Sequence, residues 1–242
     1  MKISYQVIEC NKIDKQLMEE FIHLEQKFFG LTRDDLLKSI SQKDLLYAFF
    51  KNDERKLIGT LAIKWIFFQD HVIVYLGNGA IEQEYQRHNF SNTVLFNSYL
   101  RTHWKFPGKK VCFACFMGTP KAYNIAQRYP NHFPQKGIET DVFTRQVMTI
   151  VCDTIAGEGK YEKHGDIFLL TAYKKKNTIR EKAIEGVVSY DGYYEEVNPD
   201  YRDGKQLLMV FKVDTEAFFK AGKYTLKYFM CKNNLNSQSH KK

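Results

Sequence analysis

The chain has 242 residues, of which 44% are hydrophobic and 15% aromatic, which is enough for a core and excludes a wholly disordered protein. Its formal charge of +8 favours anionic partners such as nucleic acid, an acidic membrane or a polyphosphate cofactor, without choosing among them. No apolar run approaches the ~18 residues that span a bilayer, and the N-terminus lacks the apolar core of a signal peptide. We therefore expect a soluble, cytoplasmic protein.

The first 137 residues predict strands and helices in alternation, from apolar residues spaced either by two or by three and four. Strands are expected over 3–9, 45–51, 57–68, 71–81 and 109–117, and helices over 15–29, 91–105 and 119–129. Gly77 and Gly79 interrupt the fourth strand, and glycines inside a strand often mark a bulge or a close backbone approach. Adjacent antiparallel strands followed by a strand–helix–strand crossover predict a mixed sheet.

The pattern changes beyond residue 138. A helix is expected over 141–157 and a short one over 214–222, with strands over 167–173, 206–213 and 224–230 and a solvated, tyrosine-rich loop over 189–204. The fold class we predict is α/β (α+β), with a mixed, mostly antiparallel central sheet flanked by helices. Residues 1–137 would form one domain, and residues 138–242 a C-terminal α/β extension packed on it.

Five cysteines, an odd number, argue against a disulfide framework. Cys112 and Cys115 form a CxxC inside a predicted strand, where residues three apart face opposite sides. No second CxxC or histidine pair completes a zinc set, so we expect structural cysteines and no metal.

The segment "GAIEQEYQRHNFSNTVLFNSYL" (79–100) passes from strand to helix through a loop rich in basic and hydrogen-bonding side chains. The first N–H groups of a helix lack intrahelical partners, and the helix dipole adds positive potential there, so such a loop can hold a phosphate. Backbone groups of the glycine-interrupted strand could pair with an extended, amide-bearing ligand such as pantetheine. Coenzyme A joins pantetheine to a pyrophosphate.

At this loop the sequence resembles the GNAT superfamily of acyl-CoA-dependent N-acyltransferases, whose central motif is a strand, then Arg/Gln-x-x-Gly-x-Gly/Ala, then a helix. In "QRHNFS" (86–91), Gln86 takes the Arg/Gln place, Asn89 the first Gly and Ser91 the second small residue. Asn tolerates positive φ better than most residues. "IEQEYQ" resembles the family's lead-in, with Gln83 where Pro is usual, and residues 109–134 resemble the next strand–helix segment. The resemblance covers about residues 1–137.

The resemblance implies an acetyl-CoA or related acyl-CoA co-substrate, without a metal, and a fold in which backbone holds the pantetheine arm and the loop cradles the pyrophosphate. The implied cofactor-binding residues are Asn78, Gly79, Ala80, Ile81, Gln86, Arg87, His88, Asn89, Phe90, Ser91 and Thr93. The family often carries a thiolate-protonating Tyr seven residues after an Asn at the start of the later helix. Counting from Thr119 places Ala126 there, so Tyr123 is the nearest phenol and our candidate acid. Glu82, or Glu84, is the candidate base for an amine.

We therefore expect an N-acyltransferase that moves an acyl group, by direct transfer, to an amine on an unknown small molecule or protein. The alternative is a CoA-binding or interaction module of the same fold with catalysis weakened or lost, because both loop glycines and the usual Tyr are missing. A third reading, docking on nucleic acid or an anionic membrane, has no Arg-rich stripe or aromatic RNA-binding motif to support it.

Overall fold

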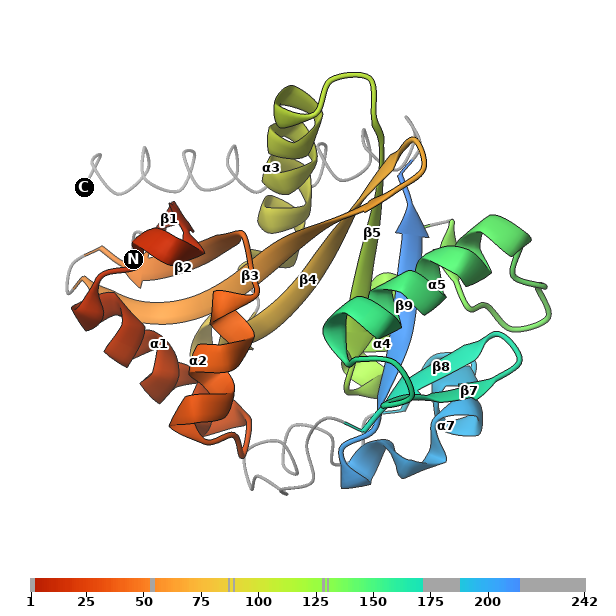
Figure 1. Ribbon diagram of the computed structural model, residues 1–242. Coiled ribbons are helices and arrows are strands. Elements are labelled where there is room, and N and C mark those ends of the chain that lie inside the picture. Colours follow the sequence, from red (N-terminus) through yellow and green to blue (C-terminus); the bar gives the residue numbers. More distant parts are fainter. Residues whose placement is uncertain are drawn as a thin grey trace, which may run out of the picture.

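Alternating apolar residues generate one continuous sheet through the chain. The computed structural model describes residues 3–52, 55–86, 88, 90–127, 129, 131–171 and 188–213. Their strands are β1 (Ile3–Glu9), β2 (Leu45–Lys51), β3 (Lys56–Phe68), β4 (His71–Ile81), β5 (Lys110–Met117), β6 (His132–Phe133), β7 (Glu162–His164), β8 (Ile167–Leu170) and β9 (Gln206–Lys212). They form a nine-stranded sheet in the order β1-β2-β3-β4-β5-β9-β8-β7, and β6 pairs with β9 (Figure 1).

Every neighbouring pair in this sheet is antiparallel except β4 and β5, which run parallel. The mixed, mostly antiparallel sheet predicted from the sequence is confirmed. β2 and β4 begin and end at the residues that the sequence predicts. The parallel pair arises because a helix, rather than a hairpin, connects its two strands.

Helices cover both faces of the sheet. They are α1 (Lys15–Phe28), α2 (Arg33–Ser41), α3 (Phe90–Lys105), α4 (Pro120–Ala126), α5 (Val142–Ile155) and α7 (Tyr193–Val197), with 3-10 turns η1 (Cys10–Lys12), η2 (Gln83–Tyr85) and η3 (Pro199–Asp203). In Figure 1, α1, α2 and α5 lie in front of the sheet and α4 lies behind it. We call these the α1 face and the α4 face.

Side-chain caps fix where the helices start, because each satisfies a first-turn N–H that has no intrahelical partner. The Asp14 carboxylate accepts from the Leu17 amide at 2.8 Å, at the start of α1. Thr119 caps α4, and Pro120 occupies the first turn, where its missing N–H costs nothing. The predicted role of Pro120 is confirmed.

Each face of the sheet has its own apolar core. On the α4 face, Tyr47, Val74 and Phe113 pack with side chains from α3, α4 and α7. On the α1 face, Ile73 and Val210 belong to a cluster that α5 completes, while α1 and α2 cover β1 to β4 with two further clusters. At roughly 1.5–3 kcal/mol for each fully buried large aliphatic or aromatic side chain, these clusters are the main source of stability.

The C-terminal part of the chain contributes central strands of the same sheet. β9 lies between β5 and β8, with Cys112 opposite Lys212 and Met117 opposite Leu207. Residues far apart in sequence therefore share one hydrogen-bonded layer. The domain boundary at residue 137 stays a prediction.

The prediction of a solvated loop over 189–204 is wrong. The segment contains α7 and η3, and Tyr194 and Tyr201 are buried. The Tyr194 hydroxyl donates to the Met117 carbonyl at 2.9 Å, which satisfies its polar end inside the core. The helix and strand expected over 214–222 and 224–230 lie outside the described residues.

Candidate functional site

β4 and β5 separate partway along their length. Their parallel register pairs His71 to Leu76 with Lys110 to Cys115, and then stops. β4 continues to Ile81, and among the described residues no β5 partner faces its segment 77–81. Figure 1 shows the two strands diverging toward the lower edge of the sheet. We call this feature the β4–β5 opening; this edge of β4 has no strand partner there, and its Ile81 carbonyl accepts from the Gln86 side chain at 3.4 Å.

A β-bulge shapes the β4 side of the opening. Asn78 and Gly79 together lie opposite the single residue Leu61 of β3, and Asn78 has a φ of +48°, which Asn tolerates better than most residues. The Ser39 hydroxyl donates to the Asn78 side-chain oxygen at 3.0 Å and ties the bulge to α2. The bulge expected from the interrupting glycines is confirmed.

Gly77 marks a close approach beside the bulge. A Cβ at Gly77 would lie 2.8 Å from Cε1 of the Tyr75 ring and 3.2 Å from Cε of Lys43. A Cβ atom that close to another side chain would force the neighbouring atoms to move. Glycine, which has no Cβ, therefore allows Tyr75 and Lys43 to occupy this space.

The predicted phosphate loop leads from the end of β4 into α3. Ser91 is the second residue of α3 and Thr93 the fourth, and the first turn contains no acidic side chain, so the positive end of the helix is not neutralised from within. Phe90 is buried against Phe49, with ring centroids 4.4 Å apart, and fixes the helix start on the sheet. Nδ1 of His88 lies 3.1 Å from the Tyr85 carbonyl. Arg87 and Asn89 lie outside the described residues.

α4 and the segment just after it add two contacts that the sequence did not predict. Lys121 donates to the Gln86 side-chain oxygen at 3.1 Å and brings a cation to the loop. The Tyr129 hydroxyl donates to the Asn92 side chain in α3. The carboxyl ends of parallel strands meet at one edge of a sheet, so the connections after β4 and β5 come together there. That rule was the available signal for Lys121.

Tyr123 is fully buried on α4, 5.5 Å in centroid distance from Tyr194. Its hydroxyl makes no hydrogen bond of good geometry among the described residues, although the Gln127 side chain lies near enough to oppose the rise of its pKa slightly. Burial raises the pKa of the phenol, and the negative charge of Asp191 raises it further, so it stays protonated and can act only as a proton donor. An unpaired buried hydroxyl costs about 1–3 kcal/mol, a cost that a ligand atom able to accept its proton would remove.

Glu82 lies at the end of β4 with both carboxylate oxygens in ion pairs. Lys27 donates to one oxygen at 3.1 Å and Lys56 to the other at 3.2 Å. Glu84 is exposed. The candidate base therefore sits beside the opening, between two lysine ammonium groups.

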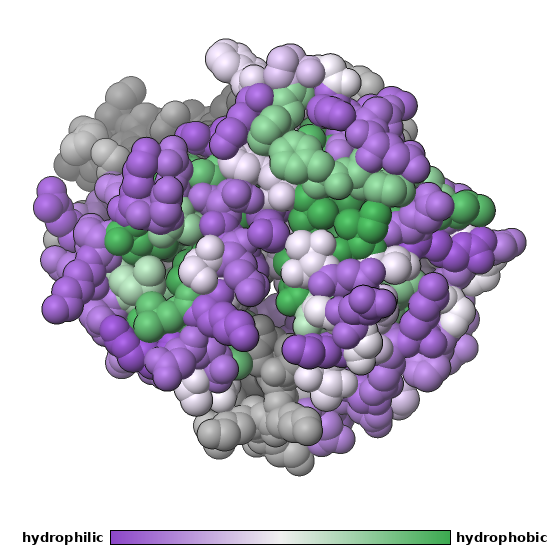
Figure 2. Space-filling view, viewed as in Figure 1, coloured by the Kyte–Doolittle hydropathy of each residue, from purple (hydrophilic) through white to green (hydrophobic). Residues whose placement is uncertain are grey.

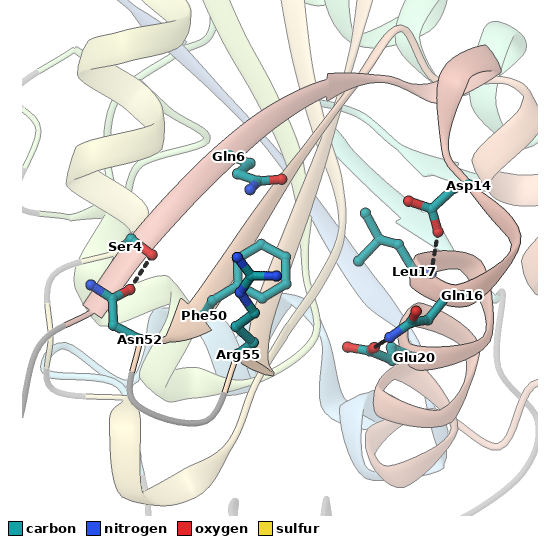
Figure 3. Close-up of a pocket in the computed structure, with 9 residues that line it drawn as sticks. All are labelled: Ser4, Gln6, Asp14, Gln16, Leu17, Glu20, Phe50, Asn52 and Arg55. Atoms are coloured by element: carbon teal, nitrogen blue, oxygen red, sulfur yellow. Dashed lines mark hydrogen bonds between the residues drawn. The ribbon is translucent and has the colours of Figure 1, made fainter.

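An open pocket of about 570 Å³ lies elsewhere, between β1 and α1 (Figure 3). Its lining side chains bond to one another: Ser4 donates to Asn52, and Gln16 to Glu20 at 3.1 Å. It includes none of the residues predicted for the site and holds no pair of groups arranged as nucleophile and base. We do not assign it a role.

The predicted residues of β4, the loop and α4 thus gather at one end of the parallel pair. The structure places Asn78, Gly79, Ala80 and Ile81 along the opening, Gln86, His88, Phe90, Ser91 and Thr93 at the start of α3, and Tyr123 on α4. The described residues contain no cluster of three or more His, Cys, Asp or Glu side chains that could hold a metal ion. Of the described helices, none is long and apolar enough to cross a membrane.

Neither a protein-family model nor a curated protein sequence matches the chain. Solved structures that it resembles include an aminoglycoside acetyltransferase from an uncultured soil metagenomic sample (13% identity, 59% of this chain and 98% of that chain, TM-score 0.42). An N-acetyltransferase from Staphylococcus aureus Mu50 matches at 9% identity over 88% of this chain and 98% of that one, with a TM-score of 0.42. A predicted acetyltransferase with acetyl-CoA from Clostridium acetobutylicum matches at 14% identity, over 59% and 98% of the two chains, with a TM-score of 0.39.

All three of these structures are described as acetyltransferases. The likeness is weak in both identity and superposition. We therefore take the fold class, a mixed and mostly antiparallel α/β sheet, from the strand order. The case for a function rests on the geometry of the β4–β5 opening.

Proposed function

We propose that the protein is an acyl-CoA-dependent N-acyltransferase, with acetyl-CoA the expected donor. The observation that carries this proposal is the β4–β5 opening, which presents a strand edge without a β5 partner and leads directly to the start of α3. Unpaired backbone N–H and C=O groups are strong hydrogen-bonding groups that need partners. The two amides of a pantetheine arm, lying along Asn78 to Ile81, would supply them.

The other end of the cofactor would lie at the loop. In this arrangement the pyrophosphate meets the first-turn amides of α3, with Gln86, Arg87, His88, Asn89, Phe90, Ser91 and Thr93 around it. Lys121, held at the loop by Gln86, adds a positive charge beside the same anion. Backbone donors, a helix dipole and a nearby cation act in the same direction, which supports phosphate binding.

The chemistry is direct transfer. A neutral amine attacks the thioester carbon, the C–N bond forms and the C–S bond breaks, and β4 amides at the opening stabilise the oxyanion. Tyr123, held protonated by burial, would give its proton to the departing thiolate. Glu82 stays the candidate base; its carboxylate would take the amine's proton through water by releasing Lys27 or Lys56.

Replacing Ser91 with Asp tests the phosphate seat. The new negative charge would lie in the first turn of α3 and repel the pyrophosphate, so we expect acetyl-CoA affinity in calorimetric titration to fall about two- to fivefold. An acidic residue at a helix N-terminus stabilises the helix, so the loss would not reflect unfolding. Ser91→Asn has the same shape without the charge and should bind close to wild type. Equal binding by both variants would contradict the site.

A second measurement separates transfer from binding alone. CoA thiol release in the presence of a panel of amines would establish the enzyme. Binding of acetyl-CoA without thiol release for any amine would favour the CoA-binding module, which the buried position of Tyr123 also fits. No binding of any CoA species, together with salt-sensitive nucleic-acid binding, would reject both.

A further inference from the structure

Lys43 approaches the β4–β5 opening from the α1 face. It reaches the closed end of the opening, at Gly77, where the pairing of β4 with β5 stops. It lies between α2 and β2, and its side chain crosses β3 to reach β4, since Leu45, Ile63 and Leu76 are paired across these three strands. Its Nζ lies 5.2 Å from the centroid of the Tyr75 ring. Its Cε lies 3.2 Å from the position of a Cβ on Gly77, the first β4 residue without a β5 partner.

The Lys43 side chain is mostly buried and makes no ion pair among the described residues. The residue is 8% exposed, and among the described residues its Nζ has no hydrogen bond or ion pair, only the face of the Tyr75 ring. Burial and then the positive charge of Lys64 lower the pKa of Lys43 to about 8, against smaller opposing effects of Cys10 and Asp44. At neutral pH about a tenth of this amine is therefore uncharged, roughly two orders of magnitude more than for an ordinary lysine.

The direction of the chain decides which end of a bound acyl-CoA lies beside Lys43. β4 runs from Gly77 through the bulge to Ile81 and then into the proposed phosphate loop. A cofactor with its pyrophosphate at the loop and its pantetheine along Asn78 to Ile81 would bring its thioester to the Gly77 end. Lys43 covers that end on the α1 face. Figure 2 shows this face hollowed near its centre, between α2 and α5.

Lys43 also lines a cavity of about 630 Å³, shared with Cys10, Met18, Leu37, Ile40 and Trp65. The cavity is bounded by η1, α1, α2 and α3 and by the adjoining residues of β2 and β3. It gives the amine a route by which a proton can be lost to solvent.

We propose that Lys43 is a self-acylation site, at which the protein transfers the acyl group of a bound acyl-CoA to its own amine. This inference rests on the proposed function, since it requires a thioester at the opening. The neutral Nζ attacks the thioester carbon; the C–N bond forms, the C–S bond breaks with its electron pair on sulfur, and the proton lost by nitrogen goes to the thiolate. The products are acyl-Lys43 and free CoA thiol.

Self-acylation would change the site in two ways. It removes a positive charge from a side chain that is largely buried and has no ion-pair partner among the described residues, and burial of charge is costly, so the acylated protein should be more stable than the unmodified one. It also places an amide where the acceptor amine would approach, which would slow transfer to other amines. The modification would thus act as a brake on the proposed reaction.

The test is incubation of the purified full chain with acetyl-CoA at pH 8, followed by intact mass and peptide mass spectrometry. We expect one acetyl group per chain on Lys43, saturating with acetyl-CoA and suppressed by excess CoA. Lys38, exposed on α2 five residues earlier, is the internal reference and should carry at least tenfold less label. Lys43→Arg keeps the charge and should remove the specific label, while Lys43→Gln should raise the melting temperature above that of Lys43→Arg.

A small acetyl thioester without the nucleotide separates positioning from mere reactivity, because it should label Lys43 far less than acetyl-CoA does. Equal labelling of Lys43 and Lys38, or equal labelling of Lys43 by the two donors, would overturn the inference. Thermal stabilisation by CoA measured in the same samples keeps the two proposals apart. Stabilisation without a Lys43 label rejects self-acylation alone, whereas no stabilisation and no label reject the acyl-CoA site as well.

Discussion

Glu25 lies on the buried face of α1, and its side chain is completely inaccessible to solvent. The Thr60 hydroxyl donates to one carboxyl oxygen at 2.8 Å, and the other oxygen has no partner among the described residues. Burial raises the pKa of Glu25 from 4.5 to about 8, and the bond from Thr60 opposes that shift only in part. The group is therefore protonated in the folded protein at neutral pH.

The buried carboxyl predicts a pH-dependent stability with a definite sign. Between pH 4.5 and about 8 the folded state binds a proton that the unfolded state has lost, so the free energy of unfolding falls as pH rises through this window. The fall is on the order of a few kcal/mol. Glu25→Gln stays neutral at every pH and should remove this slope in urea unfolding measured at several pH values.

Glu20→Gln, on the same helix with its carboxylate bonded to Gln16 at the surface, is the control and should leave the slope in place. A wild-type stability that is flat or rises from pH 5 to 8, or an unchanged slope in Glu25→Gln, would contradict a protonated Glu25. The sequence could not identify Glu25 or Lys43. Glu25 is buried because α1 packs on β3, where Thr60 lies, and Lys43 because its side chain extends to Tyr75 of β4; neither contact is encoded in local spacing.

At the scale of single elements, Gly77 and Gly79 lie two residues apart in β4 but have different neighbours. A Cβ at Gly77 would lie 2.8 Å from the Tyr75 ring, whereas a Cβ at Gly79 would meet only Leu61 carbons at 3.9 Å. Gly77→Ala should therefore force Tyr75 or Lys43 to move and cost about 1–3 kcal/mol. Gly79→Ala should change the free energy of unfolding by much less.

Chemical denaturation of the two variants beside the wild type measures this difference. Equal costs at the two positions would mean that bulge geometry, rather than the close approach of Tyr75, requires glycine in this strand. The acyl-CoA affinity of Gly77→Ala should fall as well, because the shift would occur at the closed end of the β4–β5 opening.

The elements that the sequence predicts correctly are those with local causes. Spacing by two or by three and four gives β2, β4, α1 and α3, and Pro120 after a capping Thr119 gives the start of α4. The prediction of a solvated loop over 189–204 was wrong because the segment is mostly polar in sequence. Its buried tyrosines are covered by β5 and α4, which are contacts between distant parts of the chain. Two glycines in the strand predicted an irregularity at this position. The extent of the opening depends on where the pairing of β5 with β4 stops, which is a tertiary property.

At the scale of the whole molecule, β9 joins the two parts of the chain into one sheet. Leu208 of β9 is fully buried on the α1 face, in a cluster with Cys112, Ala114 and Val151. Leu208→Ala should cost about 2–5 kcal/mol from lost burial and the cavity left behind. For a chain of this length that corresponds to a fall in melting temperature of about 5–15 °C.

The measurement that decides is whether a substitution in β9 changes the unfolding midpoint reported by a probe in β3. Trp65 lies in β3, and Trp104→Phe removes the other tryptophan, which is 84% exposed. In that background, if the sheet unfolds as one unit, Leu208→Ala should lower the Trp65 fluorescence midpoint as much as the far-ultraviolet circular dichroism midpoint. Thr154→Ala, exposed on α5, should move neither. A Trp65 transition that stays in place while the other shifts would mean that the part before residue 137 unfolds independently, because strand pairing across β5 and β9 would then be too weak to couple the two.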